Sequence, residues 1–171
     1  MNQKVDQLMA LADRLSVQDL VIKYAKARDT TDAALYREIF SEDAVIASGA
    51  GKVLSNGLDA ILSKVANDRV RFNPASQPGV VSYAIMRHDI SNIDISLRGD
   101  AAQSDYYVNT LAYNETAKRP EIISCARNVD EYVKRNGRWW IVKSTLNFGW
   151  ENEEMGKALR LGPYTPPEYR R

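Results

Sequence analysis

Apolar residues recur at helical spacing through the first third of the chain. They form three stripes, namely Val5, Leu8, Met9, Ala12 and Leu15, then Val17, Leu20, Val21 and Tyr24, then Leu35, Tyr36, Ile39 and Phe40. Ser16 with Asp19 three residues later is a variant of the capping box, which predicts that a second helix begins there. Thr30 or Thr31 is expected to cap the third helix. Asp29 therefore falls in a predicted turn between two helices.

The next segments mix a short strand, a helix and a loop. Residues 44–47 are β-like, and a glycine-containing turn separates them from a predicted fourth helix. The apolar stripe of that helix consists of Leu58, Ile61, Leu62 and Val65. Residues 67–79 contain Pro74 and Pro78 and show no clear period, so we expect a loop. Loops of that length in compact domains are often lids or binding loops.

The second half of the chain alternates apolar and polar residues as strands do. The predicted strands are 90–97, 101–113, 122–133 and 139–148, with a turn at 98–100 and a strong hairpin signal at Asn136-Gly137. Helices followed by an antiparallel meander indicate an α+β fold. We expect a single domain over residues 1–160. The proline-rich segment 161–171 is expected to be an extended C-terminal tail.

Composition narrows the range of chemistry. The chain has 171 residues, a net charge of +1, one His and one Cys. The lone Cys125 cannot form an internal disulfide, and a single His with a single Cys cannot build a usual zinc site, so no metal is expected. The small net charge argues against a nucleic-acid partner. Neither a secretory signal nor an 18-residue apolar run is evident, so we expect a cytoplasmic protein with no membrane partner.

Acid–base chemistry is what remains, because the common nucleotide-binding, zinc-protease and serine-hydrolase signatures are absent. The candidates are Tyr24 on a helix face, Asp29 five residues later and His88 at the start of a strand. A carboxylate bound to one imidazole nitrogen leaves the other to take a proton, while a phenol can donate to an oxyanion or leaving group. On spacing alone each residue is more often structural.

Four blocks of sequence carry a resemblance to a known family. They are LSVQDLVIKYAKARD (15–29), IFSEDAV (39–45), RHDISN (87–92) and DEYVKRNGRW (130–139). In this order they resemble the SnoaL-like family of the cone-shaped α+β superfamily, which includes ketosteroid isomerase, scytalone dehydratase, limonene epoxide hydrolase and nuclear transport factor two. The resemblance implies N-terminal helices packed in a curved antiparallel sheet, with a deep and mostly apolar cone-shaped pocket.

The resemblance also implies roles for the three candidates. Bile-acid dehydratases and hexachlorocyclohexane dehydrochlorinase place a Tyr or Lys five residues before an Asp, and a His in the motif His-x-x-x-Asn. Tyr24, Asp29 and His88, with Asn92 four residues later, match these positions. In such relatives the His–Asp dyad is the base of an elimination that needs no cofactor. This chain departs from scytalone dehydratase, which uses further His and Tyr residues, because it has no second His. A basic residue that some relatives place on the last strand is not clearly matched between Lys143 and Phe148.

Further candidates come from the strands. In 101–113 the smaller and more apolar parity is expected to face inward, which would place Tyr106 and Thr110 in the pocket. Asn128 and Asn147 on the later strands could orient a substrate oxygen, although surface positions flanking the strand ladder remain the alternative. Arginine and tryptophan residues of these strands are interpreted as surface or packing positions.

The function expected from these residues and this resemblance is that of a cofactor-independent lyase, either a dehydratase or an enzyme that eliminates formaldehyde. Its substrate is expected to be small and hydrophobic, phenolic or polycyclic, as in the catabolism of aromatic compounds. An isomerase or polyketide cyclase using the same base is one alternative, and a non-catalytic binding or assembly subunit is another. The superfamily implies a homodimer or homotrimer.

Overall fold

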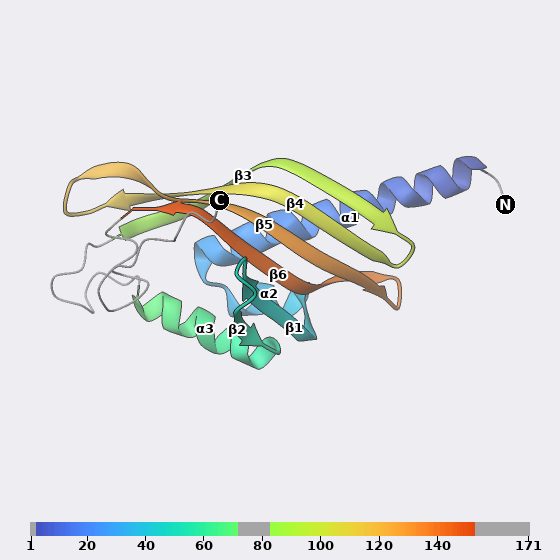
Figure 1. The fold of residues 1–171 in the computed structure, drawn as a ribbon, viewed down its shortest axis with the longest axis horizontal. Coiled ribbons are helices and arrows are strands. Elements are labelled where there is room, and N and C mark those ends of the chain that lie inside the picture. Colours follow the sequence, from blue (N-terminus) through green and yellow to red (C-terminus); the bar gives the residue numbers. More distant parts are fainter. Residues whose placement is uncertain (1–2, 72–82, 153–171) are drawn as a thin grey trace.

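The computed structural model describes residues 3–71 and 83–152. Figure 1 shows helices packed against one twisted sheet. The elements are α1 (Gln3–Thr30), α2 (Ala33–Ile39), β1 (Phe40–Ser48), β2 (Val53–Asn56), α3 (Leu58–Arg71), β3 (Tyr83–Arg98), β4 (Ala101–Asn114), β5 (Arg119–Arg135) and β6 (Arg138–Glu151). Within this part of the chain, no helix is at once long and apolar enough to cross a membrane.

The sheet has the strand order β2-β1-β6-β5-β4-β3. Strands β3 to β6 form the predicted antiparallel meander, whereas β1 pairs with β6 in parallel. The α+β class is therefore confirmed, and the sheet is mixed where an antiparallel one was expected. The Asn136-Gly137 hairpin is also confirmed, since both residues have the positive φ (52° and 75°) that a tight hairpin turn of this type requires.

The first two predicted helices are one. Ser16 does not cap a new helix, because its hydroxyl donates to the carbonyl of Ala12 at 2.9 Å, inside the continuous helix α1. A serine inside a helix can donate its hydroxyl hydrogen to the carbonyl four residues earlier, and a capping-box pattern then does not start a new helix. As a consequence Asp29 lies in the last turn of α1 and not in a turn between helices.

The next helix begins later than expected. Its cap is Asp32, whose Oδ1 accepts from the backbone N–H groups of Ala34 and Leu35 at 2.9 and 3.2 Å. This corrects the expectation that Thr30 or Thr31 would serve. The carboxylate of Asp32 satisfies two of the donors that every helix start leaves open.

Two further boundaries differ from the prediction. The β-like stretch 44–47 is the middle of the longer strand β1, and α3 continues to Arg71, into the predicted loop 67–79. The short strand β2 occupies part of the region expected to be a turn. The remainder of that loop from residue 72 on and the predicted tail 161–171 lie outside the described residues.

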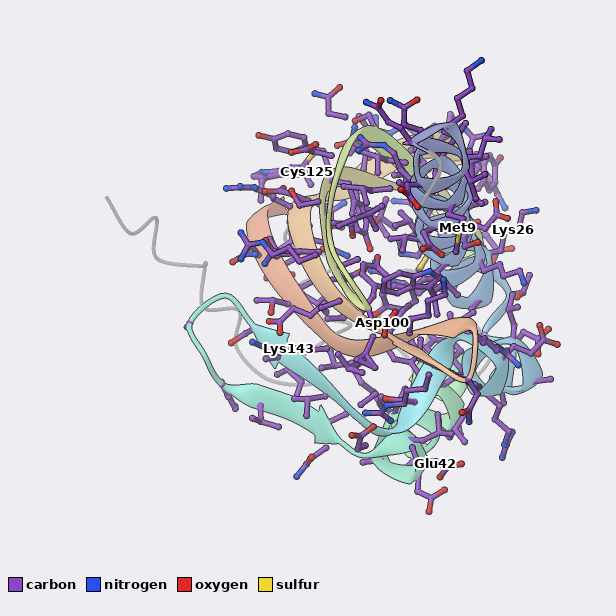
Figure 2. The ribbon with its side chains drawn as sticks, turned by 90° about the vertical axis from the view of Figure 1, so that its right-hand side faces the viewer. Met9, Lys26, Glu42, Asp100, Cys125 and Lys143 are labelled. Atoms are coloured by element: carbon purple, nitrogen blue, oxygen red, sulfur yellow. The ribbon has the colours of Figure 1, made fainter. Side chains whose placement is uncertain are left out.

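The core lies between α1 and the concave face of the sheet, which curves around the helix in the view of Figure 2. The second apolar stripe of α1 is buried, as are its partners on the strands. Examples are Val17, Val21, Tyr24, Tyr106, Val108, Tyr132 and Ile141. The first stripe is exposed, with Leu8 66% and Leu15 54% accessible, and this end of α1 extends past the sheet in Figure 1. The second half of α1 is therefore the part of the helix that the concave face covers.

Candidate active site

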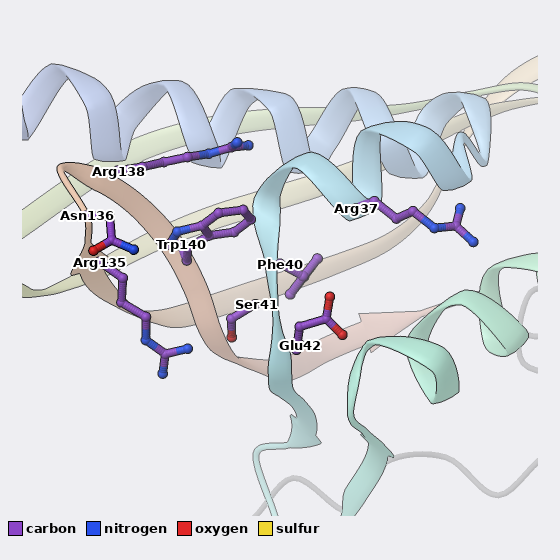
Figure 3. A pocket seen from close by; sticks show the side chains of 8 residues that line it. All are labelled: Arg37, Phe40, Ser41, Glu42, Arg135, Asn136, Arg138 and Trp140. Atoms are coloured by element: carbon purple, nitrogen blue, oxygen red, sulfur yellow. The ribbon is translucent and has the colours of Figure 1, made fainter.

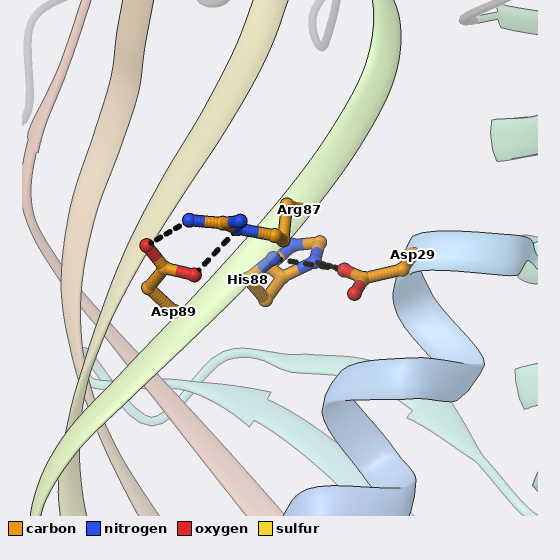
Figure 4. A network of polar contacts seen from close by, with 4 residues as sticks. All are labelled: Asp29, Arg87, His88 and Asp89. Carbon is orange, nitrogen blue, oxygen red and sulfur yellow. Dashed lines mark hydrogen bonds and ion pairs between the residues drawn. The ribbon is translucent and has the colours of Figure 1, made fainter.

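The end of α1 and the first half of β3 bring Asp29 and His88 together (Figure 4). His88 lies within the strand and not at its start as expected, because β3 begins at Tyr83. Asp29 Oδ1 lies 2.6 Å from Nδ1 of the His88 ring and accepts the backbone N–H of the same residue at 2.8 Å. Because an ionised carboxylate can only accept, Nδ1 carries the hydrogen and Nε2 keeps its lone pair. One oxygen atom thus fixes both the position and the tautomer of the imidazole.

His88 is held as a neutral base by its surroundings. The residue is 8% exposed, and burial lowers its pKa to about 4, with the positive charge of Arg28 acting in the same direction. The negative charges of Asp29 and Asp89 oppose this shift without reversing it. At neutral pH the imidazole is therefore uncharged and able to accept a proton at Nε2.

The neighbours of His88 along β3 point to the other face of the strand, as alternation requires. Arg87 and Asp89 form an exposed ion pair at 2.7 Å, visible beside the dyad in Figure 4. Asn92, the last residue of the His-x-x-x-Asn motif, is exposed and has a positive φ of 52°. It lies where the pairing of β3 with β4 shifts between Ser91 and Asp94. Asn tolerates this backbone conformation better than most residues, which fits its place at the irregularity in the pairing.

Tyr24 is buried on α1 but faces a different direction from Asp29. Five residues along a helix separate two side chains by about 140° around its axis. The ring of Tyr24 packs edge-on against Tyr36 and Phe40, with centroids 6.0 and 5.0 Å away, and the Arg28 guanidinium lies 5.8 Å from it. The structure thus joins two of the three candidates by a hydrogen bond and places the third in an adjoining aromatic cluster.

Three of the four strand candidates face inward. The predicted inward parity of β4 is observed, and Tyr106 and Thr110 are 1% and 2% exposed. Thr110 pairs with His88 across β3 and β4, which places it beside the dyad. Tyr106 pairs with Asn128 on β5, which is one strand further from β3 and the dyad. Asn128 is itself 1% exposed.

Asn147 is not brought to this face. It pairs with Arg127, whose exposed side chain is bound to Asp105 on the outer surface of the sheet. The reason is a bulge in β6: Ile141 pairs with Tyr132, but the next partner of β5 is Lys143, so one extra residue reverses the alternation. An alternation read from sequence cannot detect such an insertion.

A group of buried polar residues that the motifs do not single out lies on the same inner face. Tyr106 donates its hydroxyl hydrogen to Asp130 Oδ2 at 2.6 Å, and Tyr132 approaches the same oxygen at 3.4 Å. Asp130 is fully buried, and this burial raises its pKa to about 6, although the nearby Ser144 hydroxyl and the hydrogen bonds from Tyr106 and Tyr132 favour the ionised form. The signal in the sequence is the alternation of Asn128, Asp130 and Tyr132, which puts three polar side chains on one face.

A cavity of about 380 Å³ lies elsewhere, between the end of α2, β1 and the β5–β6 hairpin (Figure 3). Its walls include Phe40, Glu42, Arg135 and Trp140, and none of the candidates above lines it. Trp140 lies under the guanidinium of Arg138, 4.1 Å from its ring centre, while Trp139 on the opposite face is buried. The two tryptophans thus face opposite sides of β6, and Trp139 is the one in the core.

Among residues 3–71 and 83–152, no three His, Cys, Asp or Glu side chains lie close enough together to hold a metal ion. His88 offers a proton acceptor, Asp29 a fixed negative charge beside it, and Tyr24 and Tyr106 buried phenols.

A family model for the SnoaL-like domain matches residues 9–145. The chain belongs to the SnoaL-like domain family. The matched range contains most of α1, the dyad and nearly all of the sheet, so the fold implied by the sequence blocks is confirmed. No curated protein matches the chain.

Solved structures similar to this SnoaL-like protein share its architecture at low identity. An NTF2-like protein with a cystatin-like fold from Novosphingobium aromaticivorans has a TM-score of 0.70 and 18% identity, covering 85% of this chain and 87% of its own. Hexachlorocyclohexane dehydrochlorinase LinA-type3 from Novosphingobium barchaimii LL02 has a TM-score of 0.65 and 18% identity, covering 96% and 97%. A variant of Rv3472, a protein of unknown function from Mycobacterium tuberculosis, has a TM-score of 0.65 and 21% identity, covering 86% and 76%. These similarities show the fold, and the fold is used both by an enzyme and by proteins of unknown function.

Proposed function

We propose that this protein is a cofactor-independent lyase in which His88 is the general base. The observation that carries the proposal is the double hydrogen bond to Asp29 Oδ1, from the backbone and from the ring of the same histidine. It orients the imidazole and leaves Nε2 available, while burial keeps the ring neutral, and this is the arrangement a general base needs. The substrate we propose is a small hydrophobic compound, phenolic or polycyclic.

In the proposed elimination, Nε2 of His88 removes a proton from a carbon atom of the substrate. The electron pair of the broken C–H bond forms a C=C bond, and the C–O bond on the adjacent carbon breaks so that its electron pair stays on the leaving oxygen. Tyr24 supplies the proton that turns this leaving group into water. Asp29 stabilises the imidazolium that forms, and both His88 and Tyr24 recover their protonation states by exchange with solvent.

A second version uses the same base on a hydroxymethyl group. His88 takes the hydroxyl proton, the adjacent C–C bond breaks, and formaldehyde leaves. The electron pair remains on the other carbon, which then takes up a proton. Both versions require one neutral base on a buried face and no redox group, which is what His88 provides.

Two further observations support an elimination. The chain matches the positions Tyr, Asp and His that its family resemblance implies. A structural neighbour is named as a dehydrochlorinase, which is an elimination enzyme by its name. An isomerase or cyclase in the same site remains the enzymatic alternative, and its product would have the mass of its substrate. A non-catalytic binding or assembly subunit would bind without turnover.

The test is incubation of the purified protein with aryl compounds that carry either a benzylic alcohol with a C–H bond on the adjacent carbon or a hydroxymethyl group, followed by mass spectrometry. Loss of water or of formaldehyde, abolished in His88→Gln and Asp29→Asn, is the expected result. Asp105→Asn is the matched control, because it removes a carboxylate that is paired with Arg127 on the outer surface of the sheet, away from the dyad. Turnover that survives in His88→Gln, or a product of unchanged mass, would contradict the proposal.

We also propose that the protein acts as a homodimer or homotrimer. Large apolar side chains remain exposed on the strands, among them Tyr107, Ile122 and Trp150, which are 50%, 49% and 42% accessible. Contact between copies would remove this apolar area from water. Sedimentation equilibrium would decide, and a monomer at micromolar concentration would contradict this part of the proposal.

A further inference from the structure

In the part of the chain that the structure describes, three buried oxygen atoms on the inner face of the sheet have no hydrogen-bond partner. They are Asn128 Oδ1, Asp130 Oδ1 and Ser144 Oγ, and each residue is at most 1% exposed. Asp130 pairs directly with Ser144 across β5 and β6, and Asn128 precedes Asp130 by two residues on the same face of β5. The Ser144 hydroxyl lies close enough to Asp130 to lower the pKa of the carboxyl group as a hydrogen-bond donor does, although Ser144 Oγ and Asp130 Oδ1 fall outside hydrogen-bond geometry. Buried polar atoms are almost always paired in folded proteins, so a group of three neighbours needs an explanation.

The directions of the surrounding hydrogen bonds show what is missing. Tyr106 gives its only hydroxyl hydrogen to Asp130 Oδ2, so it can only accept from Asn128 Nδ2, which lies 3.5 Å away. This orients the Asn128 amide and leaves its Oδ1 as an acceptor without a donor. Asp130 Oδ1 is a second such acceptor. The group thus lacks at least one hydrogen-bond donor.

Few chemical groups could serve as the missing partner. It must donate to a carboxylate or amide oxygen, and Ser144 can donate to it or accept from it in return. A hydroxyl group does both. A carbonyl oxygen has no hydrogen to give, and a carboxylate would be repelled by the negative charge of Asp130.

The group of unpartnered atoms lies on the same inner face as the dyad, at some distance from it. His88 pairs with Thr110, whereas Tyr106 lies four residues further along β4, a distance of about 13 Å on a strand. α1 packs on the concave face that carries both residues, and the charge of Arg28 in its last turn acts on both His88 and Asp130. A molecule of two or three fused rings would span this separation.

We propose that Asn128, Asp130 and Ser144 form a subsite that binds a hydroxyl group of the substrate, at the end opposite to the bond that His88 attacks. That the ligand is the substrate of His88 rests on the proposed function. The subsite itself rests on the unpartnered atoms, and it selects an alcohol or phenol over the corresponding ether or ketone.

The experiment compares two probes, 2-naphthol and 2-methoxynaphthalene, which have the same ring system but differ in the hydrogen that can be donated. Calorimetric titration at neutral pH is expected to show 2-naphthol binding roughly tenfold more tightly, the scale of a hydrogen bond to a charged acceptor. Ser144→Ala and Asn128→Leu should each reduce this preference severalfold. Ser55→Ala is the matched control, because Ser55 is a buried serine on the distant strand β2.

Three outcomes would overturn the subsite. In the first, the two probes bind equally, and in the second, neither binds. In the third, the preference for 2-naphthol persists in both variants, which would mean that these atoms bind an internal water and no ligand. Ser144→Ala is expected to fold, since it removes a hydroxyl that has no partner, and its melting temperature checks this. The proposed function is tested separately by His88→Gln, which should retain the preference for 2-naphthol while losing turnover. A protein without lyase activity that still prefers 2-naphthol would refute the lyase and leave the subsite standing.

Discussion

His88 and Asp130 are both buried titratable groups on the concave face of the sheet, and burial disfavours the charged form of each. The pKa of the histidine is lowered to about 4 and that of the aspartate is raised to about 6. Their hydrogen bonds differ. His88 is held by a carboxylate from α1, a separate element, whereas Asp130 accepts from tyrosines of the sheet.

This difference determines what each group can offer a ligand. The bond to Asp29 uses one nitrogen of His88 and leaves the other as a proton acceptor of fixed direction. At Asp130 the hydrogen bonds converge on Oδ2, and Oδ1 remains without a partner. The same physical cost of burial thus yields a base in one place and a hydrogen-bond acceptor in the other. Comparing the two residues by mutation tests this description.

The largest effect is expected from Asp29→Asn on turnover. The amide can donate to Nδ1 through its nitrogen, which favours the tautomer with the hydrogen on Nε2 and removes the base. We expect kcat to fall roughly 10²- to 10⁴-fold, the usual contribution of general acid–base catalysis. Steady-state kinetics on the substrate found by the product screen measures this, with Asp105→Asn on the outer surface of the sheet as the control. A decrease of less than threefold would mean that Asp29 does not set the tautomer.

Asp130→Asn is expected to change how stability depends on pH. Between the ordinary pKa of 3.8 and the raised value of about 6, the folded protein binds more protons than the unfolded chain, so Asp130 costs stability as pH rises through this window. The cost levels off above pH 6 at about 3 kcal/mol. Urea denaturation from pH 4 to 7 should show the variant gaining about this amount relative to the wild type. A difference that does not vary with pH would show that the pKa of Asp130 is not raised.

His88→Gln is expected to give the opposite trend. The folded-state pKa of His88 is about 4, below its ordinary value of 6.5, so the unfolded chain binds more protons between these values and the wild type gains stability as pH rises toward 6.5. The variant should therefore lose stability relative to the wild type over this range. The size of the change should be similar to that for Asp130, because the two pKa values move by similar amounts in opposite directions. The same denaturation series measures it, and a trend of the same sign in both variants would contradict the comparison.

Alternation and turn chemistry allowed much of the sheet to be predicted from sequence. The inward residues of β4 and the Asn136-Gly137 hairpin follow from a period of two and from the positive φ of a tight turn. Asn147 could not be placed in this way, since the bulge in β6 is a property of the pairing between two strands. The continuity of α1 through Ser16 depends likewise on a hydrogen bond that competes with capping.

The candidate site was predictable to a different extent. Asp29 and His88 are 59 residues apart, and spacing alone gives no reason to join them; the family resemblance supplied that pair. The resemblance did not supply their shared oxygen atom or the unpartnered group around Asp130. Both depend on which side chains several strands and a helix bring to one face, and this is decided by packing.

The smallest effect expected is the difference between the two phenols that approach Asp130. Tyr106 donates to Oδ2 at 2.6 Å and Tyr132 lies at 3.4 Å, so the first stabilises the carboxylate more strongly. Tyr106→Phe should raise the titration midpoint of Asp130 by about one pH unit, and Tyr132→Phe should raise it by less. The ¹³C shift of the Asp130 carboxyl group, followed through a pH titration, measures both. If Tyr132→Phe had the larger effect, the acidity of Asp130 would be controlled through the bond between Tyr132 and Ser104, 2.7 Å long, and the orientation assigned to Asn128 from Tyr106 would have to be revised.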